Sequence, residues 1–178
     1  VRVAALTALA RVGGGRAAEL ARAAWSRDTS YEVRGRALQT LALLDSAGRR
    51  EVIARGLATP SYRDAIVNGA LGAVVQANDT SFIPQVDSAV GNAIEPSFVL
   101  AILGSRGNAR ALDLLVTHLD DDRPMVRRWA LIAIENALPP GLATTRLQSV
   151  RDRLAHADTK RAVTAALDRL SKQGGHDQ

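Results

Sequence analysis

The sequence predicts an all-α protein built from repeated pairs of helices. Three observations predict it: a phrase that recurs at nearly constant spacing, a composition rich in alanine and poor in aromatic residues, and turn-forming residues between the phrases. Of the 178 residues, 32 are alanine, whereas Trp, Tyr and Phe number two each. Alanine favours helices, and strands favour aromatic and β-branched residues, so the composition excludes an all-β fold.

The recurring phrase has the form V-R-x-x-A-L-x-x-L-A. It reads VRVAALTALARVG from Val1 and VRGRALQTLALLD from Val33, and it returns as IVNGALGAVVQAN from Ile66 and VRRWALIAIENAL from Val126. Degenerate copies begin at residues 95 and 159, so successive starts lie 29 to 33 residues apart. A period of this length is typical of helical repeats that stack as a solenoid.

Each phrase places its apolar residues on one helical stripe, as Val33, Ala37, Leu38 and Leu41 illustrate. We therefore expect the second helix of each pair near residues 1–12, 33–44, 66–77, 95–106, 126–138 and 159–171. Shorter amphipathic segments at about 16–26, 48–58, 81–91, 108–119 and 142–156 are expected to form the first helices. The predicted architecture is a single domain of residues 1–178, an elongated right-handed α-α superhelix of about five helix pairs with a leading half repeat.

Turn-forming residues lie between the predicted helices. Gly13–Gly15 and Asn78 follow second helices, where glycine and asparagine tolerate positive φ and end a helix. Gly104 and Gly107 are expected to interrupt the end of the second helix in the shortest repeat, so residues 91–107 are predicted to be the least regular part of the stack. The polar stretch 171–178 is expected to fray.

The predicted core consists of the apolar positions that recur on the helical stripes. These residues are Leu6, Leu9, Leu38, Leu41, Ala70, Leu71, Val74, Leu100, Leu112, Leu115, Ala130, Leu131, Ile134, Val163 and Leu167.

No residue in the sequence predicts a reaction. Cysteine is absent, which excludes a disulfide framework, thiolate metal ligands and a cysteine nucleophile. His118, His156 and His176 lie 38 and 20 residues apart, and none has a neighbouring Glu or His at metal-ligand spacing. We expect His118 to lie partly exposed near a helix C-terminus. No catalytic, cofactor-binding or metal-binding residue is assigned, and no cofactor is expected.

The acidic run Asp120–Asp121–Asp122 lacks the alternating spacing of a calcium loop. It lies just ahead of Pro124, where acidic side chains favour the N-terminus of a helix. We therefore expect these residues to cap the helix that follows.

Arginine recurs near the start of the second helices, as Arg2, Arg34 and Arg127. The net charge of +5 admits phosphate binding, but 18 acidic residues are interspersed with the 23 basic ones. Asp28 precedes Arg34 by six residues, and Asp122 precedes Arg127 by five. The preferred interpretation is a ladder of structural ion pairs across the turns, and a phosphate-binding row of arginines is the alternative.

Four large aromatic residues, Trp25, Tyr31, Tyr62 and Trp129, lie at turns and helix starts. Tyr31 and Tyr62 occupy related places, in TSYEV and PSYRD. We expect them to pack the turns within the helix pairs rather than stack on a ligand.

The paired helices, the period near 31 and the Arg after Val resemble HEAT-like repeats over essentially the whole chain. The sequence DTSYEVRGRALQTLALL, followed by LATPSYRDAIVNGALGAV, is also similar to the C-terminal helical-repeat region of bacterial aminopeptidase N-like zinc metallopeptidases. This resemblance implies a non-catalytic domain that encloses an active-site chamber and shapes peptide access. The zinc ligands, in an H-E-x-x-H motif that this chain lacks, would lie upstream of Val1 in the same polypeptide.

Three other hypotheses remain open. In the first, the chain is an interaction scaffold for a protein partner. In the second, it is a nucleic-acid-binding helical-repeat protein, and in the third it is a relative of the bilin-lyase-like repeats, for which no set of chromophore-binding residues is identified.

The start at Val1 without an initiator Met leads us to expect a C-terminal piece of a larger protein. No membrane segment is predicted, and the sequence indicates no compartment.

Overall fold

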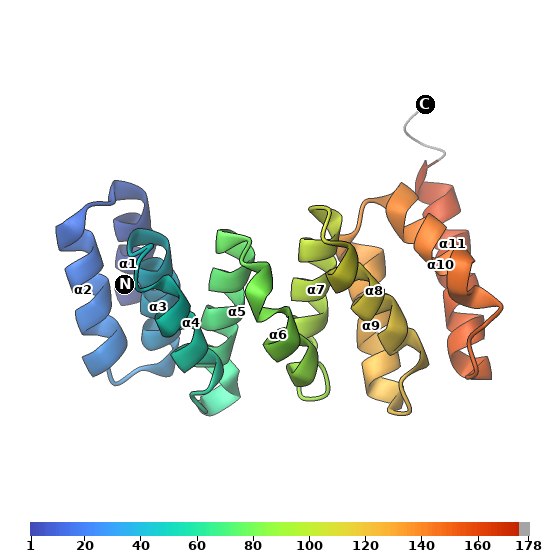
Figure 1. Ribbon diagram of the computed structural model, residues 1–178, viewed down its shortest axis with the longest axis horizontal. Coiled ribbons are helices and arrows are strands. Elements are labelled where there is room, and N and C mark those ends of the chain that lie inside the picture. Colours follow the sequence, from blue (N-terminus) through green and yellow to red (C-terminus); the bar gives the residue numbers. More distant parts are fainter. Residues whose placement is uncertain (175–178) are drawn as a thin grey trace. The chain divides into compact units, whose positions relative to one another are not determined.

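The computed structural model describes residues 1–174 and confirms the all-α class. This part of the chain contains eleven α-helices and three short 3-10 helices, and no strand (Figure 1). Its contacts divide the chain into two compact units, Val1–Asp79 and Thr80–Gln178. The single continuous superhelix stays a prediction.

The first unit contains five helices: α1 (Arg2–Val12), α2 (Gly15–Arg27), α3 (Tyr31–Leu44), α4 (Arg49–Leu57) and α5 (Ala65–Ala77). A 3-10 turn, Tyr62–Asp64, precedes α5. The central helix α3 packs against the other four, most extensively against α5. Ser30 caps α3 by accepting a hydrogen bond from the Val33 amide at 3.4 Å.

Two glycines let α3 and α5 approach closely. A Cβ on Gly35 would collide with the carbonyl oxygen of Ala65, and one on Gly69 would collide with the backbone of Gly35. Neither residue has a positive φ, so the close approach of the two backbones explains the glycines. The repeat pattern does not predict this contact.

The second unit contains six helices: α6 (Ile83–Ala89), α7 (Glu95–Ser105), α8 (Ala109–Thr117), α9 (Pro124–Ala137), α10 (Pro140–Arg151) and α11 (Ala157–Gly174). A short 3-10 turn, Thr80–Phe82, precedes α6, and another, His118–Asp120, follows α8. Helix α7 packs against α6, α8 and α9, whereas α10 packs mainly against α11. The α10–α11 pair contacts α8 and α9 much less closely.

Helices occupy all six ranges expected for second helices and all five expected for first helices. The largest differences are in the first helices. The segment expected at 81–91 is a 3-10 turn followed by a helix of seven residues, and the helix expected at 142–156 runs from Pro140 to Arg151. Residues 171–174, expected to fray, belong to α11, and residues 175–178 lie outside the described part of the chain.

The expected interruption at Gly104 is wrong. Helix α7 continues through Gly104 to Ser105, and a Cβ on Gly104 would lie 3.0 Å from the Cβ of Leu112. The glycine therefore allows α7 and α8 to pack closely. Gly107 does end the segment, with φ of 95°.

Thirteen of the fifteen predicted core residues are buried, and Leu9 and Leu167 are only half-buried. Leu9 lies on α1 and Leu167 on α11, and each of these helices contacts just two other helices of its unit closely. First helices add core residues that the repeated phrase does not contain, among them Trp25, Ile53, Val86 and Leu147.

Candidate functional site

The predicted pair between Asp28 and Arg34 is wrong. The Nε atom of Arg34 donates to the carbonyl oxygen of Trp25 at 3.1 Å, and its guanidinium lies 5.2 Å from the centroid of the Trp25 ring. Asp28 instead accepts from Arg2 of α1 at 2.8 Å. Arg34 reaches back to the end of α2 because the last carbonyls of a helix lack partners within it.

The side chain of Arg127 donates four hydrogen bonds. Its NH1 donates to the main-chain carbonyls of Asp121 and Asp122 at 2.8 and 3.1 Å. The remaining donors bind the start of α11: Nε contacts Thr159 Oγ1 at 2.8 Å, and NH2 contacts the Asp158 carboxylate at 2.9 Å. The expected ion pair with the Asp122 side chain is therefore wrong, because Asp122 contributes its carbonyl oxygen.

Six arginines form ion pairs that join neighbouring helix pairs. The partners lie 23 to 34 residues apart in sequence, close to the repeat period. These pairs are Arg2–Asp28, Arg22–Asp45, Arg50–Asp79, Arg127–Asp158, Arg146–Asp113 and Arg169–Glu135.

The acidic run does not cap α9 with its side chains. The N-cap residue of α9 is Arg123, and it makes no side-chain cap hydrogen bond. The Asp120 carboxylate accepts from the Ala155 amide at 2.9 Å, in the turn before α11. The Asp121 carboxylate accepts three hydrogen bonds from Arg123, each 2.9 Å long, and the Arg123 side chain is the main reason that the pKa of Asp121 falls from 3.8 to about 2.

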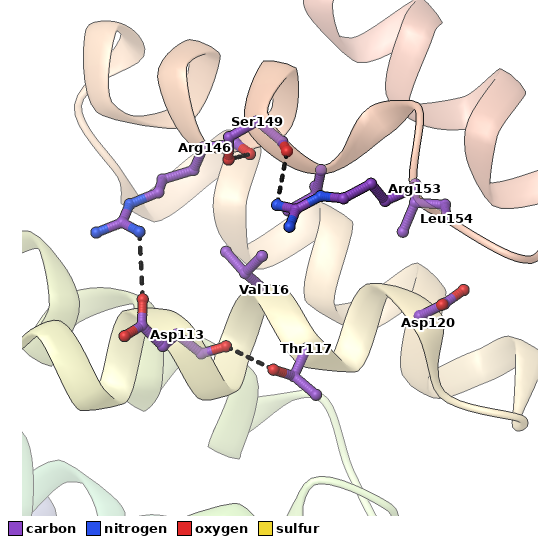
Figure 2. A pocket seen from close by; sticks show the side chains of 9 residues that line it. Asp113, Val116, Thr117, Asp120, Arg146, Ser149, Arg153 and Leu154 are labelled. Carbon is purple, nitrogen blue, oxygen red and sulfur yellow. Dashed lines mark hydrogen bonds and ion pairs between the residues drawn. The ribbon is translucent and has the colours of Figure 1, made fainter.

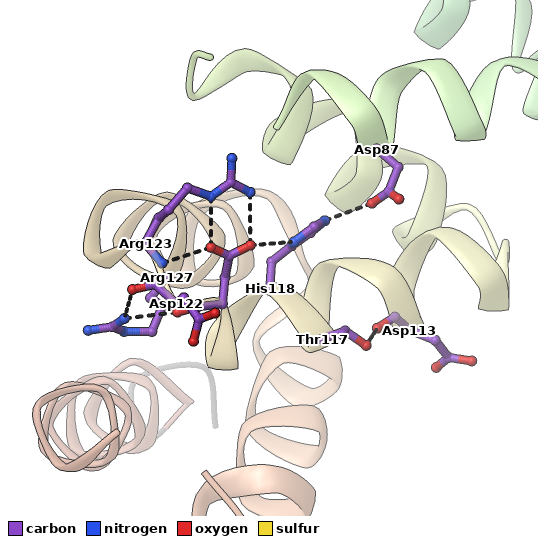
Figure 3. A network of polar contacts seen from close by, with 8 residues as sticks. Asp87, Asp113, Thr117, His118, Asp122, Arg123 and Arg127 are labelled. Atoms are coloured by element: carbon purple, nitrogen blue, oxygen red, sulfur yellow. Dashed lines mark hydrogen bonds and ion pairs between the residues drawn. The ribbon is translucent and has the colours of Figure 1, made fainter. Parts of the chain in front are cut away.

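His118 lies between two carboxylates (Figure 3). Its Nε2 is 2.7 Å from Asp87 Oδ1 in α6, and its Nδ1 is 3.9 Å from Asp121 Oδ2. The side chain is 14% exposed and lies at the C-terminal end of α8, where the sequence places it. The contacts connect α6 to the turn before α9.

His156 does not join this network. His156 lies in the turn before α11, where its carbonyl accepts from the Lys160 amide at 3.0 Å, and His176 lies outside the described residues. Within residues 1–174, no three His, Cys, Asp or Glu side chains come together in a way that would hold a metal ion.

The two tyrosines do not pack the turns as expected. Tyr31 is 43% exposed and Tyr62 is 69% exposed, and the guanidinium of Arg63 lies 5.2 Å from the Tyr62 ring centroid. Tyr31 is the first residue of α3 and Tyr62 begins a 3-10 turn, so few neighbours surround either ring. Trp25 is buried in the first unit, and Trp129 is half-buried on α9.

Grooves lie between neighbouring second helices in both units. In the first unit a groove of about 360 Å³ opens over α1, α3 and α5. In the second unit a larger groove of about 550 Å³ separates α9 from α11, and we call it the α9–α11 groove. The first is lined by Val3, Glu32, Gly35, Arg36, Gln39, Ala65, Asn68 and Gly69; the second by Pro124, Met125, Arg127, Arg128, Leu131, Ile132, Glu135, Asp158, Thr159, Ala162 and Arg169.

A third groove, of about 390 Å³, lies between the first helices α8 and α10 (Figure 2). Arg146 of α10 pairs with Asp113 of α8 at 3.2 Å, and Arg153 donates to the Ser149 carbonyl at 2.8 Å. Val116, Val150 and Leu154 supply apolar lining. The Arg146–Asp113 pair joins α10 to α8, whereas the Arg153 bond stays within the end of α10 and the residues that follow it.

No protein-family model matches the sequence, and no curated protein matches it. Within the described residues, none of the helices has the length and apolar character that crossing a bilayer requires. The resemblance to aminopeptidase N-like proteins therefore stays a prediction.

Proposed function

We propose that this chain is a non-catalytic helical-repeat domain that binds a protein or peptide segment through the outward faces of its second helices. The observation that carries the proposal is that each unit, taken by itself, has a groove lined by successive second helices. Stacked repeats commonly bind partners on extended surfaces of this kind. The volumes, about 360 and 550 Å³, lie within the range of pockets that hold small ligands or short segments.

The ion pairs favour a protein partner over nucleic acid. At least ten of the 21 arginines lie within 4.0 Å of a carboxylate oxygen. Binding to phosphates depends on cations that can replace the counterions of the nucleic acid. Arginines already neutralised by a neighbouring carboxylate contribute less to such binding.

The aminopeptidase resemblance suggests one specific partner, a catalytic domain in the same polypeptide. In that arrangement the second-helix faces would enclose the active-site chamber and restrict which peptides enter it. An interaction scaffold for a separate protein uses the same faces, and the face that makes contact is the feature common to both versions of the proposal.

Photo-crosslinking tests which face binds. p-Benzoylphenylalanine replaces Glu32 or Met125 on second helices, or Arg110 or Gln148 on first helices, in the full-length protein in its native host. Glu32 and Met125 line the two second-helix grooves, and all four side chains are exposed. The proposal predicts a discrete cross-linked product, within the polypeptide or to another protein, from Glu32 and Met125. Products of equal yield from Arg110 and Gln148 would contradict it.

A further inference from the structure

We propose that the α9–α11 groove selects acidic amphipathic segments, in which an aliphatic side chain enters the groove and a nearby carboxylate pairs with Arg128. This inference rests on the proposed function, since it assigns a partner chemistry to one of the second-helix faces. It follows from three features of the groove: its apolar lining, its paired acidic residues and one arginine that has no partner among the described residues.

The lining offers an apolar surface between two loosely packed helices. Met125 is 50% exposed, and Ile132 and Ala162 continue the apolar surface along the two helices, while Leu131, which is 7% exposed, also lines the groove. Helices α9 and α11 make few close contacts with each other, so the seam between them stays open. Burying an aliphatic side chain here removes apolar area of both molecules from water, which favours binding.

The acidic residues of the groove are already neutralised. Glu135 accepts from Arg169 of α11 at 2.7 Å, and Asp158 accepts from Arg127 of α9 at 2.9 Å. These two pairs cross the groove from opposite helices and hold its walls at a fixed separation. A groove whose shape is fixed before binding loses less conformational entropy when a ligand enters.

Arg128 differs from the other arginines that line grooves. Arg36, Arg127, Arg146, Arg153 and Arg169 each donate at least one hydrogen bond to the protein. Arg128 is exposed and has no hydrogen-bond or ion-pair partner among the described residues. Its planar guanidinium suits the two oxygens of a carboxylate, and this pairing gives the groove a preference for acidic over neutral or basic segments.

The test is a titration of the ¹⁵N-labelled full chain, followed by NMR, with three tetrapeptides. The first, acetyl-Glu-Leu-Leu-Glu-amide, carries both features. Acetyl-Gln-Leu-Leu-Gln-amide lacks the charge, and acetyl-Glu-Ser-Ser-Glu-amide lacks the apolar side chains. We expect the first peptide to shift amide signals of α9 and α11 and to bind at least about threefold more tightly than either of the others. Raising the salt concentration from about 50 mM to about 0.5 M should reduce this preference, because salt screens exposed charges.

Three variants assign the effect to the groove. Arg128→Gln should make the Glu and Gln peptides bind equally, whereas Arg110→Gln, which removes another exposed arginine of the unit, should leave the preference unchanged. Ala162→Phe should block binding of both peptides by filling the groove, and its folding is checked by the midpoint of thermal unfolding.

Two outcomes would overturn the inference. Equal binding of the Glu and Gln peptides to the unaltered chain would show a groove without charge selection, and the proposed function would stand. Signals that shift away from α9 and α11, or no binding at all, would also overturn it. The cross-linking comparison at Glu32 and Met125 tests the proposed function independently of these peptides.

Discussion

Arg127 of α9 donates to the carboxylate of Asp158 at 2.9 Å, although the two residues lie 31 positions apart in sequence. The same guanidinium binds two main-chain carbonyls before α9 and the hydroxyl of Thr159. One side chain, 7% exposed, thus connects the start of one second helix to the start of the next. Pairs with this sequence separation explain how consecutive helix pairs of the second unit hold one another.

Replacing Arg127 with Ala should lower the free energy of unfolding by about 2 kcal/mol, since it leaves two carbonyls and the buried Thr159 hydroxyl without their donor. Arg151→Ala is the matched control, because the Arg151–Asp152 pair is exposed and joins adjacent residues. Its cost should stay within about 0.5 kcal/mol. Urea unfolding measures both, and equal costs would contradict the structural role of Arg127.

Gly35→Ala should destabilise the protein by about 1–3 kcal/mol, although alanine favours helices more than glycine does. The new methyl group would meet the carbonyl oxygen of Ala65, so α3 and α5 would have to move apart. In Gly141→Ala, in the first turn of α10, the added Cβ meets nothing within 4 Å beyond its chain neighbours and its own helix backbone, so the change should be neutral or stabilising by up to about 1 kcal/mol. Thermal unfolding of the two variants tests the close approach, and a stabilised Gly35→Ala protein would rule it out.

The stability that Asp121 contributes should disappear in acid. Its pKa is about 2 in the folded protein, below its ordinary value of 3.8, so folding favours the ionised carboxylate. The contribution, about 1–2 kcal/mol, is complete above about pH 5 and is lost as the pH falls toward about 2. The free energy of unfolding of Asp121→Asn, compared with that of the unaltered protein, should therefore show a deficit at neutral pH that shrinks in this range. A deficit that does not change with pH would show that the carboxylate charge is unimportant.

The repeated phrase predicts the helices well because helix positions depend on local periodicity. The stripe that contains Leu38 and Leu41 predicts both the element and its buried face. Leu9 and Leu167 follow the same pattern but are half-buried, because burial also depends on which helices lie alongside. A periodic pattern carries no information about whether a neighbouring helix is present.

The partners of the polar residues could not be predicted in the same way. A separation of five or six residues suggests contact across a turn, yet Arg34 and Arg127 reach main-chain carbonyls, which no sequence pattern distinguishes. Glycine within a helix normally weakens it, and the sequence alone does not show that Gly35 and Gly69 allow the backbones of α3 and α5 to approach closely. Likewise, the sequence does not predict that Met125 and Arg128 line the α9–α11 groove, because the groove arises from tertiary packing.

The most direct test of the second-helix face is hydroxyl-radical footprinting of the protein alone and in complex with the partner identified by cross-linking. Met125 is the sole methionine of the sequence and lines the α9–α11 groove, and Tyr62 is an exposed residue of the turn before α5. Both side chains react readily when exposed, so mass spectrometry of the modified peptides reports their access to solvent. The account predicts that the partner slows modification of Met125 severalfold and leaves Tyr62 unchanged. Unchanged modification of Met125 in the complex would contradict it.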